Sequence, residues 1–281
     1  RACIKPGMRF TAPERADLDA AVFTHPVFDT LEQAHLALCR QPQWPEVAEL
    51  NALWRAPENR FGTPYRFVAQ ETLADGLHYE QRIFEHGLIS TRSRNWHDLF
   101  NAFIWMRFSR IKAALNVRQC QDIAEVGAKQ RTRSQCALTH FDEAGAVIRL
   151  SDERLLAHWD EHDWPALFAG FNHALANGDA QLWLFGHSIY EHALNPDIAL
   201  IAKAQVFIGG DATGDESMDT WLAGRIIGRQ CFGDPQELRP IPLSGLAHWH
   251  ASYGQADFYR SVPCFRPKRA GKSYPASLHI K

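Results

Sequence analysis

The stretch "RSRNWHDLFNAFIWMRF", residues 92–108, contains the clearest helical pattern of the sequence. From Asn95 to Val117 apolar residues recur every three or four positions, which is the spacing of one buried helix face. Ser93 or Asn95 can cap the first turn, where Asp98 suits the positive end of the helix dipole. The pattern therefore predicts a long central helix whose apolar face comprises Trp96, Leu99, Phe100, Phe103, Ile104, Met106, Ile111 and Leu115.

Two polar side chains lie on the apolar side of this helix. His97 and Asn101 are four residues apart, and the same line continues through Ile104, Trp105 and Phe108. Asn101 is a full turn inside the helix and cannot be its cap, so its amide needs other partners, because an orphaned polar group costs about 1–3 kcal/mol. Two interpretations stay open: the pair ties the helix to a neighbouring part of the protein, or it forms one wall of a pocket.

Other segments also show helical spacing. The expected helices span residues 30–40, 45–55, 151–177 and 215–230, and the third ends near Asn177-Gly178. Residues 77–90 fit either a helix or a strand. Residues 180–195 fit either one buried helix or a short strand that runs into a helix at Gly186.

Three segments have the composition of strands. Residues 64–70 alternate in polarity, and residues 198–210 are rich in valine and isoleucine. The stretch "CALTHFDEAGAVIRLS", residues 136–151, predicts a β-hairpin with Asp142 and Glu143 in its turn.

These elements predict a mainly helical α+β fold with a long central helix, a β-hairpin and a small mixed sheet. The whole chain, residues 1–281, is expected to form a single domain, because no linker or repeat divides it. Residues 1–30 and 235–281 are interrupted by prolines, so we expect an irregular lead-in and an irregular C-terminal wrap.

The composition argues against several classes of protein. Thirty lysines and arginines balance 32 acidic residues, giving a net charge of -2, whereas proteins that bind nucleic acid or membranes usually carry a basic excess. There is no apolar run long enough to span a membrane and no signal-peptide layout at Arg1. The six cysteines show no metal-binding or disulfide spacing, so we expect reduced thiols in a cytoplasmic protein.

The string "FGHSIY", residues 185–190, is the strongest catalytic motif. A strand, a Gly-His-Ser turn and a helix resemble the nucleophile elbow of serine hydrolases, but Tyr190 occupies the place where that motif needs a second glycine. Read as a helix, the same stretch places His187 and Glu191 on one face, a spacing that suits two metal ligands or an oriented imidazole.

Two further basic strings offer weaker candidates. Arg131 and Arg133 can contact an anionic ligand through their guanidinium groups, or can simply be surface residues. The "AGKS" string, residues 270–273, lacks the glycine that a phosphate-binding loop needs before it.

Three strings, "RNWHDLFNAFIWMRFSRIKAALN", "RTRSQCALTHFDEAGAV" and "LFGHSIYEHALNP", resemble the bacterial domain of unknown function 3025 family in their order and intervals. The resemblance covers roughly residues 75–265, and "ADFYRSVPCFRP" is similar to the end of that family. It implies a soluble bacterial protein with a single domain. It brings no activity, cofactor or catalytic residue that could be transferred to this chain.

Two functional hypotheses follow from the sequence. In the first, the polar cluster is structural and the chain is a binding or scaffold module without chemistry. In the second, the three strings line a cleft of a hydrolase that acts on a small anionic molecule, with or without a metal. The cleft would use His97, Asp98, His187 and Glu191 for catalysis and Asn101, Arg131 and Arg133 for the substrate. The sequence identifies no particular metal, cofactor or oligomeric state.

Overall fold

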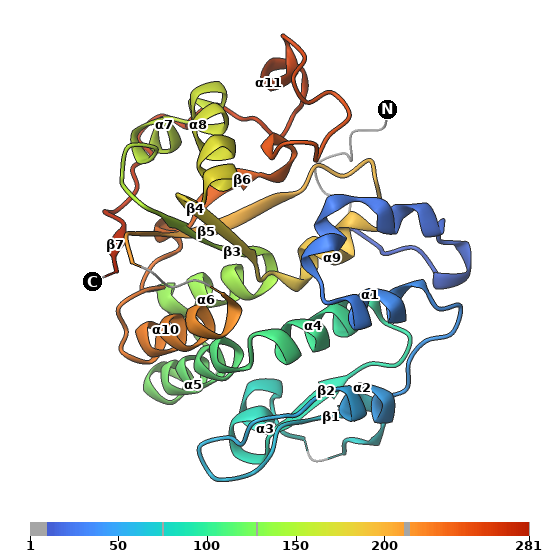
Figure 1. The fold of residues 1–281 in the computed structure, drawn as a ribbon. Helices are drawn as coiled ribbons and strands as arrows, with labels where there is room; N and C mark the ends of the chain where they lie inside the picture. Colours follow the sequence, from blue (N-terminus) through green and yellow to red (C-terminus); the bar gives the residue numbers. More distant parts are fainter. Residues whose placement is uncertain (1–9, 75, 128, 211–213, 281) are drawn as a thin grey trace. The chain divides into compact units, whose positions relative to one another are not determined.

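The computed structural model describes residues 10–74, 76–127, 129–210 and 214–280, and the chain divides into two compact units (Figure 1). Unit 1 comprises Arg1–Thr30, Glu143–Asp211 and Gln236–Lys281, and unit 2 comprises Leu31–Asp142 and Ala212–Pro235. The predicted α+β class is confirmed, since helices predominate and two small sheets accompany them. That the whole chain forms a single domain stays a prediction. Within the described residues, no helix is long and apolar enough to cross a membrane.

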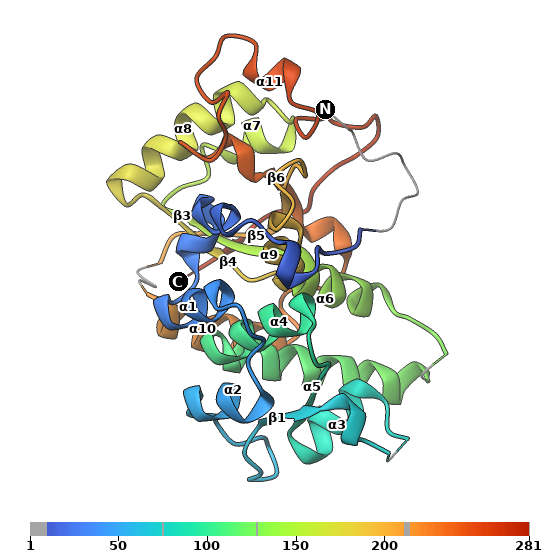
Figure 2. The ribbon, with the colours of Figure 1, turned by 90° about the vertical axis from the view of Figure 1, so that its right-hand side faces the viewer.

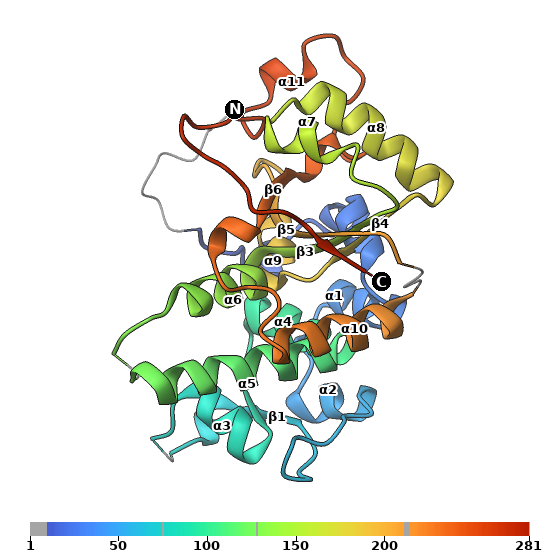
Figure 3. The ribbon, with the colours of Figure 1, turned by 90° about the vertical axis from the view of Figure 1, so that its left-hand side faces the viewer.

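Unit 2 is built around the segment that the sequence places in a central helix. α5 (Ser109–Val126) packs against α10 (Asp215–Ile227), as Figure 3 shows, and against α3 (Tyr79–His86), beside it in Figure 2. The other elements of the unit are α1 (Gln33–Arg40), α2 (Val47–Leu53) and the parallel strands β1 (Arg66–Ala69) and β2 (Leu88–Thr91). The predicted helices near 30–40 and 45–55 and the strand near 64–70 are therefore confirmed.

The predicted single helix from residue 95 to 117 is wrong in one respect, because it is two helices. α4 (Trp96–Arg107) is followed at once by α5, and Phe108 between them leaves the helical conformation with φ -126° and ψ 53°. The buried carboxylate of Asp219 accepts hydrogen bonds from the backbone N–H groups of Arg110 and Ile111, at 3.1 and 2.9 Å. A long-range partner on α10 thus caps the first turn of α5, and local spacing could not reveal it.

The predicted hairpin at residues 136–151 is also wrong, because α6 (Arg133–Ala144) runs directly into β3 (Gly145–Leu150). Thr132 and Gln135 form a reciprocal pair in which each side chain accepts a hydrogen bond from the other's backbone N–H at 2.9 Å. This is a capping box, a helix-start motif that the sequence contains as "TRSQ". Asp142 and Glu143 therefore lie in the last turn of a helix and not in a hairpin turn.

A mixed sheet forms the centre of unit 1. The strands lie in the order β4 (Ala180–Leu184), β3, β5 (Ile201–Ile208) and β6 (Arg239–Pro242), and β7 (Leu278–His279) also pairs with β5. β3 is antiparallel to β4 and parallel to β5, and all six residues of β3 are buried. The predicted small mixed sheet is confirmed. Of the two interpretations of residues 180–195, the strand followed by a helix is correct, since α9 (His187–Ala193) follows β4.

Helices and short elements complete unit 1. α8 (Trp164–Asn177) packs on β4 and ends at Gly178 in the left-handed conformation, as predicted. It follows α7 (Leu156–Asp160), so the single helix predicted over residues 151–177 is wrong and is two helices. The predicted irregular ends contain more structure than expected: η1 (Arg15–Asp17), η2 (Ala20–Thr24) and η3 (Pro26–Thr30) in the lead-in, and η5 (Pro235–Glu237), β6 (Arg239–Pro242), η6 (Leu243–Gly245), α11 (Phe258–Ser261) and β7 (Leu278–His279) in the tail.

Candidate functional site

Three polar residues of unit 1 meet where β3 begins and β4 ends. Glu143 is the second-last residue of α6, directly before β3, while His187 and Ser188 begin α9, shortly after β4. Because β3 and β4 are antiparallel with Ala146 opposite Leu184, the start of one strand lies beside the end of the other. The sheet register therefore brings the carboxylate, the imidazole and the hydroxyl to the same end of the strand pair.

A close backbone contact holds this corner together. The N–H groups of Phe185 and Gly186 both donate to the carbonyl oxygen of Gly145, at 3.0 and 2.9 Å. A Cβ atom on Gly186 would lie only 2.4 Å from the Cα of Ala144. Only glycine fits at this position, so the turn from β4 into α9 lies directly against the end of α6.

The three side chains share one oxygen atom. Ser188 Oγ donates a hydrogen bond to Glu143 Oε2, and His187 Nε2 lies 3.7 Å from the same oxygen. That separation is longer than a direct N–H···O hydrogen bond, which is about 2.7–3.2 Å. His187 and Ser188 are buried, whereas the Glu143 side chain is 44% exposed. The carboxylate is therefore the part of the cluster that solvent reaches.

The structure does not support the nucleophile-elbow interpretation of this segment. Ser188 is not among the described residues with positive φ, although the elbow motif needs a strained turn at its serine. Tyr190 is fully buried, and its hydroxyl forms a 2.8 Å hydrogen bond with Thr30 Oγ1. Tyr190 thus fills the place that a second glycine would leave open in an elbow.

Glu143 and Ser188 were missed as a pair by the sequence interpretation. The hairpin prediction puts Glu143 in the wrong element, and the "TRSQ" capping box is the sequence feature that indicates a helix there. Glu191, expected to act beside His187, lies half-buried on α9. His97 is half-buried on α4 of unit 2, whereas His187 belongs to unit 1, so their membership of one pocket stays a prediction.

Asn101 belongs to a polar network inside unit 2. Its amide nitrogen donates to the Tyr79 hydroxyl at 3.2 Å, and its amide oxygen accepts a 2.8 Å hydrogen bond from Lys112 Nζ. Lys112 Nζ also donates to Asp142 Oδ1 at 2.6 Å and lies 5.4 Å from the centre of the Trp105 ring. The Lys112 side chain is only 5% exposed. Partners within the protein thus account for the buried amide, which favours its structural interpretation.

A buried carboxyl group lies next to this network. The Asn116 amide donates to the Glu80 carboxylate at 2.6 Å and to the Glu80 backbone carbonyl at 2.8 Å, which ties α5 to α3. Burial raises the pKa of Glu80 from 4.5 to about 7, although the hydrogen bond from Asn116 opposes the shift. Burial likewise raises the pKa of Tyr79.

The other predicted residues of unit 2 have partners near the surface. Asp98 accepts hydrogen bonds from the Arg92 guanidinium at 3.0 and 2.6 Å and from the Arg92 backbone N–H at 2.7 Å. Arg133 is exposed and forms a two-point ion pair with Asp234. Arg131 donates to a threonine hydroxyl of α6 at 2.5 Å. These contacts favour the surface interpretation of both arginines.

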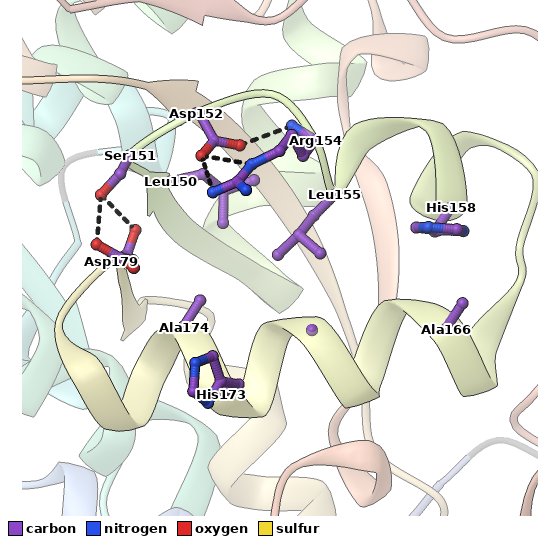
Figure 4. Close-up of a pocket in the computed structure, with 11 residues that line it drawn as sticks. Leu150, Ser151, Asp152, Arg154, Leu155, His158, Ala166, His173, Ala174 and Asp179 are labelled. Atoms are coloured by element: carbon purple, nitrogen blue, oxygen red, sulfur yellow. Dashed lines mark hydrogen bonds and ion pairs between the residues drawn. The ribbon is translucent and has the colours of Figure 1, made fainter.

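A pocket of about 310 Å³ lies at the opposite end of the β3–β4 pair (Figure 4). Ser151, which follows β3, donates to the backbone carbonyl of Asp179, which precedes β4, at 2.9 Å. Arg154 on the rim is already paired with Asp152, and α8 contributes His173 and an apolar wall. The dashed lines in Figure 4 join Ser151 to Asp179 and Arg154 to Asp152, so these polar groups are paired with one another. The pocket is therefore separated from Glu143, His187 and Ser188 by the length of the β3–β4 strand pair, which contains five paired residues on each strand.

A family model described as "Protein of unknown function (DUF3025)" matches residues 65–269. No curated protein and no solved structure matches the chain. The matched region contains Glu143, His187 and Ser188 as well as the network around Asn101. Because the match extends over most of the 281 residues, the chain belongs to the DUF3025 family, which its sequence motifs resemble.

Proposed function

We propose that this protein is a hydrolase of small molecules that activates water at the Glu143–His187 pair. The observation that carries the proposal is the meeting of a carboxylate, an imidazole and a hydroxyl at one oxygen atom, Glu143 Oε2. A water molecule beside the pair can form hydrogen bonds with both His187 Nε2 and Glu143 Oε2, because two atoms 3.7 Å apart can both lie within about 2.7–3.2 Å of a third.

Glu143 and Ser188 have distinct roles in this proposal. Glu143 is the most exposed of the three and accepts the proton of the attacking water or polarises it. Ser188 holds the carboxylate through its hydrogen bond, and the rigid turn at Gly186 fixes both α9 residues against α6. We assign the attack to water and not to Ser188, because the serine is buried and lacks the strained turn that exposes a nucleophilic serine.

The non-catalytic alternative has its own supporting observation. The Tyr79–Asn101–Lys112–Asp142 network is satisfied within unit 2, as expected of a structural cluster. We therefore keep Asn101, Arg131 and Arg133 out of the proposed chemistry. These arginines therefore do not favour an anionic substrate over a neutral one.

A substrate panel tests the proposal directly. The purified full chain would be assayed with nitrophenyl esters of phosphate, phosphodiester and carboxylic acids and with a nitroanilide, in the presence of divalent metals. We expect turnover of one class and a loss of at least about 100-fold in kcat/KM for Glu143→Gln and His187→Ala. Glu153→Gln and His173→Ala, both exposed in unit 1, are the matched controls and should retain turnover. Equal turnover in all four variants, or none in the wild type, would contradict the proposal.

We further propose that the protein works in the reducing cytoplasm on a small-molecule substrate, without nucleic acid or membrane as partner. Support comes from the cysteines: Cys39, Cys120, Cys136, Cys231 and Cys264 are all free thiols. Cys3 lies outside the described residues. Free thiols are typical of proteins kept under reducing conditions.

A further inference from the structure

We infer that His187 and Glu143 are two ligands of one divalent transition-metal ion, with zinc as the best fit. This inference rests on the proposed function and changes the role of Glu143 within it: the carboxylate holds the ion, and the bound ion would acidify the water in place of the carboxylate. A metal ion lowers the pKa of its bound water, so that the water loses its proton near neutral pH. A carboxylate or an imidazole without a metal does not lower the pKa of water in this way.

The distance between the two donor atoms is compatible with a shared metal. Zinc binds imidazole nitrogen and carboxylate oxygen at about 2.0–2.2 Å, so two such ligands of a tetrahedral ion lie about 3.4 Å apart. His187 Nε2 and Glu143 Oε2 are 3.7 Å apart, and a few tenths of an ångström of side-chain movement would close the difference. The pair is too far apart for a direct hydrogen bond and close enough to share an ion.

The chemistry of the donors selects the kind of metal. Imidazole nitrogen suits zinc, iron, copper and nickel, whereas calcium and magnesium prefer sites made of oxygen ligands. One imidazole and one carboxylate are two of the three protein ligands of a catalytic zinc site, so one further protein ligand and a water complete the coordination. The exposed side of Glu143 gives solvent access to the water position.

Ser188 supplies the support that metal ligands usually have. A ligating carboxylate is commonly held by a hydrogen bond from a neighbouring side chain, and removing such a partner weakens metal binding by about 10–100-fold. Ser188 Oγ donates to Glu143 Oε2 and is buried beside it. The close packing of Gly186 on Ala144 keeps the two halves of the site in register.

The test is a metal titration of the full chain after chelator treatment. Zinc binding would be measured by calorimetry, and cobalt binding by the visible absorption of the bound ion. We expect the wild type to bind one zinc ion per chain tightly. Zinc binding should be at least about 100-fold weaker in Glu143→Gln and His187→Ala, and about 10-fold weaker in Ser188→Ala. Ser188→Thr keeps the hydroxyl group and should bind zinc as tightly as the wild type. Glu153→Gln and His173→Ala are the controls and should bind normally. Thermal unfolding of each metal-free variant verifies that it is folded. If His187→Ala does not fold, the test depends on Glu143→Gln, which is nearly isosteric with the wild type.

The outcomes separate this inference from the proposed function. Absence of a tight equivalent, or tight binding that persists in both Glu143→Gln and His187→Ala, would overturn the metal site. Turnover that depends on Glu143 but resists chelators would overturn the metal site while the hydrolase proposal stands. Stoichiometric zinc on this pair without turnover of any substrate would support the metal site and remove the hydrolase proposal.

Discussion

Replacing Asn101 with leucine tests the polar network of unit 2. Leucine has nearly the same shape as asparagine and suits the apolar face of α4. The substitution removes the amide oxygen that accepts a 2.8 Å hydrogen bond from Lys112 Nζ. It also removes the amide nitrogen that donates a 3.2 Å hydrogen bond to the Tyr79 hydroxyl. Lys112 is 5% exposed, so water cannot readily replace the lost acceptor, although Asp142 remains bound. A hydrogen bond to a charged group contributes about 1.5–3 kcal/mol, and we expect a loss of about 2–3 kcal/mol in the free energy of unfolding.

Urea and thermal unfolding followed by circular dichroism measure this loss. For a chain of this size we expect the Tm to fall by roughly 5–10 °C. Gln43→Leu is the control, since Gln43 is exposed in the segment between α1 and α2, and its effect should stay within about 0.5 kcal/mol. An unchanged or higher unfolding midpoint for Asn101→Leu would refute the structural role of Asn101 and return it to the candidates for ligand binding.

Four further predictions follow from other parts of the structure. Gly186→Ala should cost at least about 2 kcal/mol of stability and disrupt metal binding, because the new Cβ would lie 2.4 Å from Ala144 Cα; normal unfolding would show that the corner can relax. Since the pKa of folded Glu80 is raised from 4.5 to about 7, its ionisation opposes folding: stability should fall as pH rises between those values, and Glu80→Gln should flatten that fall in urea unfolding at pH 5 and pH 8. If His97 shares a pocket with His187, as the sequence predicts, His97→Ala should weaken zinc binding about as much as His187→Ala does, and unchanged affinity would exclude it. Thiol titration of the denatured, unreduced protein should count six free groups, and fewer would indicate a disulfide.

Local patterns were enough to predict much of the fold. The helical spacing that begins at Asn95 gave the core of unit 2, and Asn95 does cap α4, accepting a 3.0 Å hydrogen bond from the Asp98 N–H. The break at Phe108 was beyond a local pattern, because the group that caps α5 is Asp219, more than 100 residues away. Spacing shows which face of a segment is buried, but it does not show which distant residue binds the end of a helix.

The candidate site was only half predictable for a related reason. His187 was recognised from its own string, but its partner Glu143 was assigned to a hairpin turn, since "DEAG" is also good turn chemistry. The decision depended on Thr132 and Gln135, eight or more residues earlier, which start the helix that carries Glu143. The pairing of β3 with β4 then brings Glu143 to His187, and the sequence alone does not determine a strand register.

X-ray diffraction from zinc-loaded crystals of the full chain, collected above and below the zinc absorption edge, tests the central claim most directly. The claim is that Glu143 and His187 form one metal-binding hydrolytic site. It predicts an anomalous peak within about 2.0–2.2 Å of both His187 Nε2 and a Glu143 carboxylate oxygen. The same map would show which further residue completes the coordination. Fully occupied zinc found only at other residues, with the Glu143–His187 pair empty, would contradict the claim.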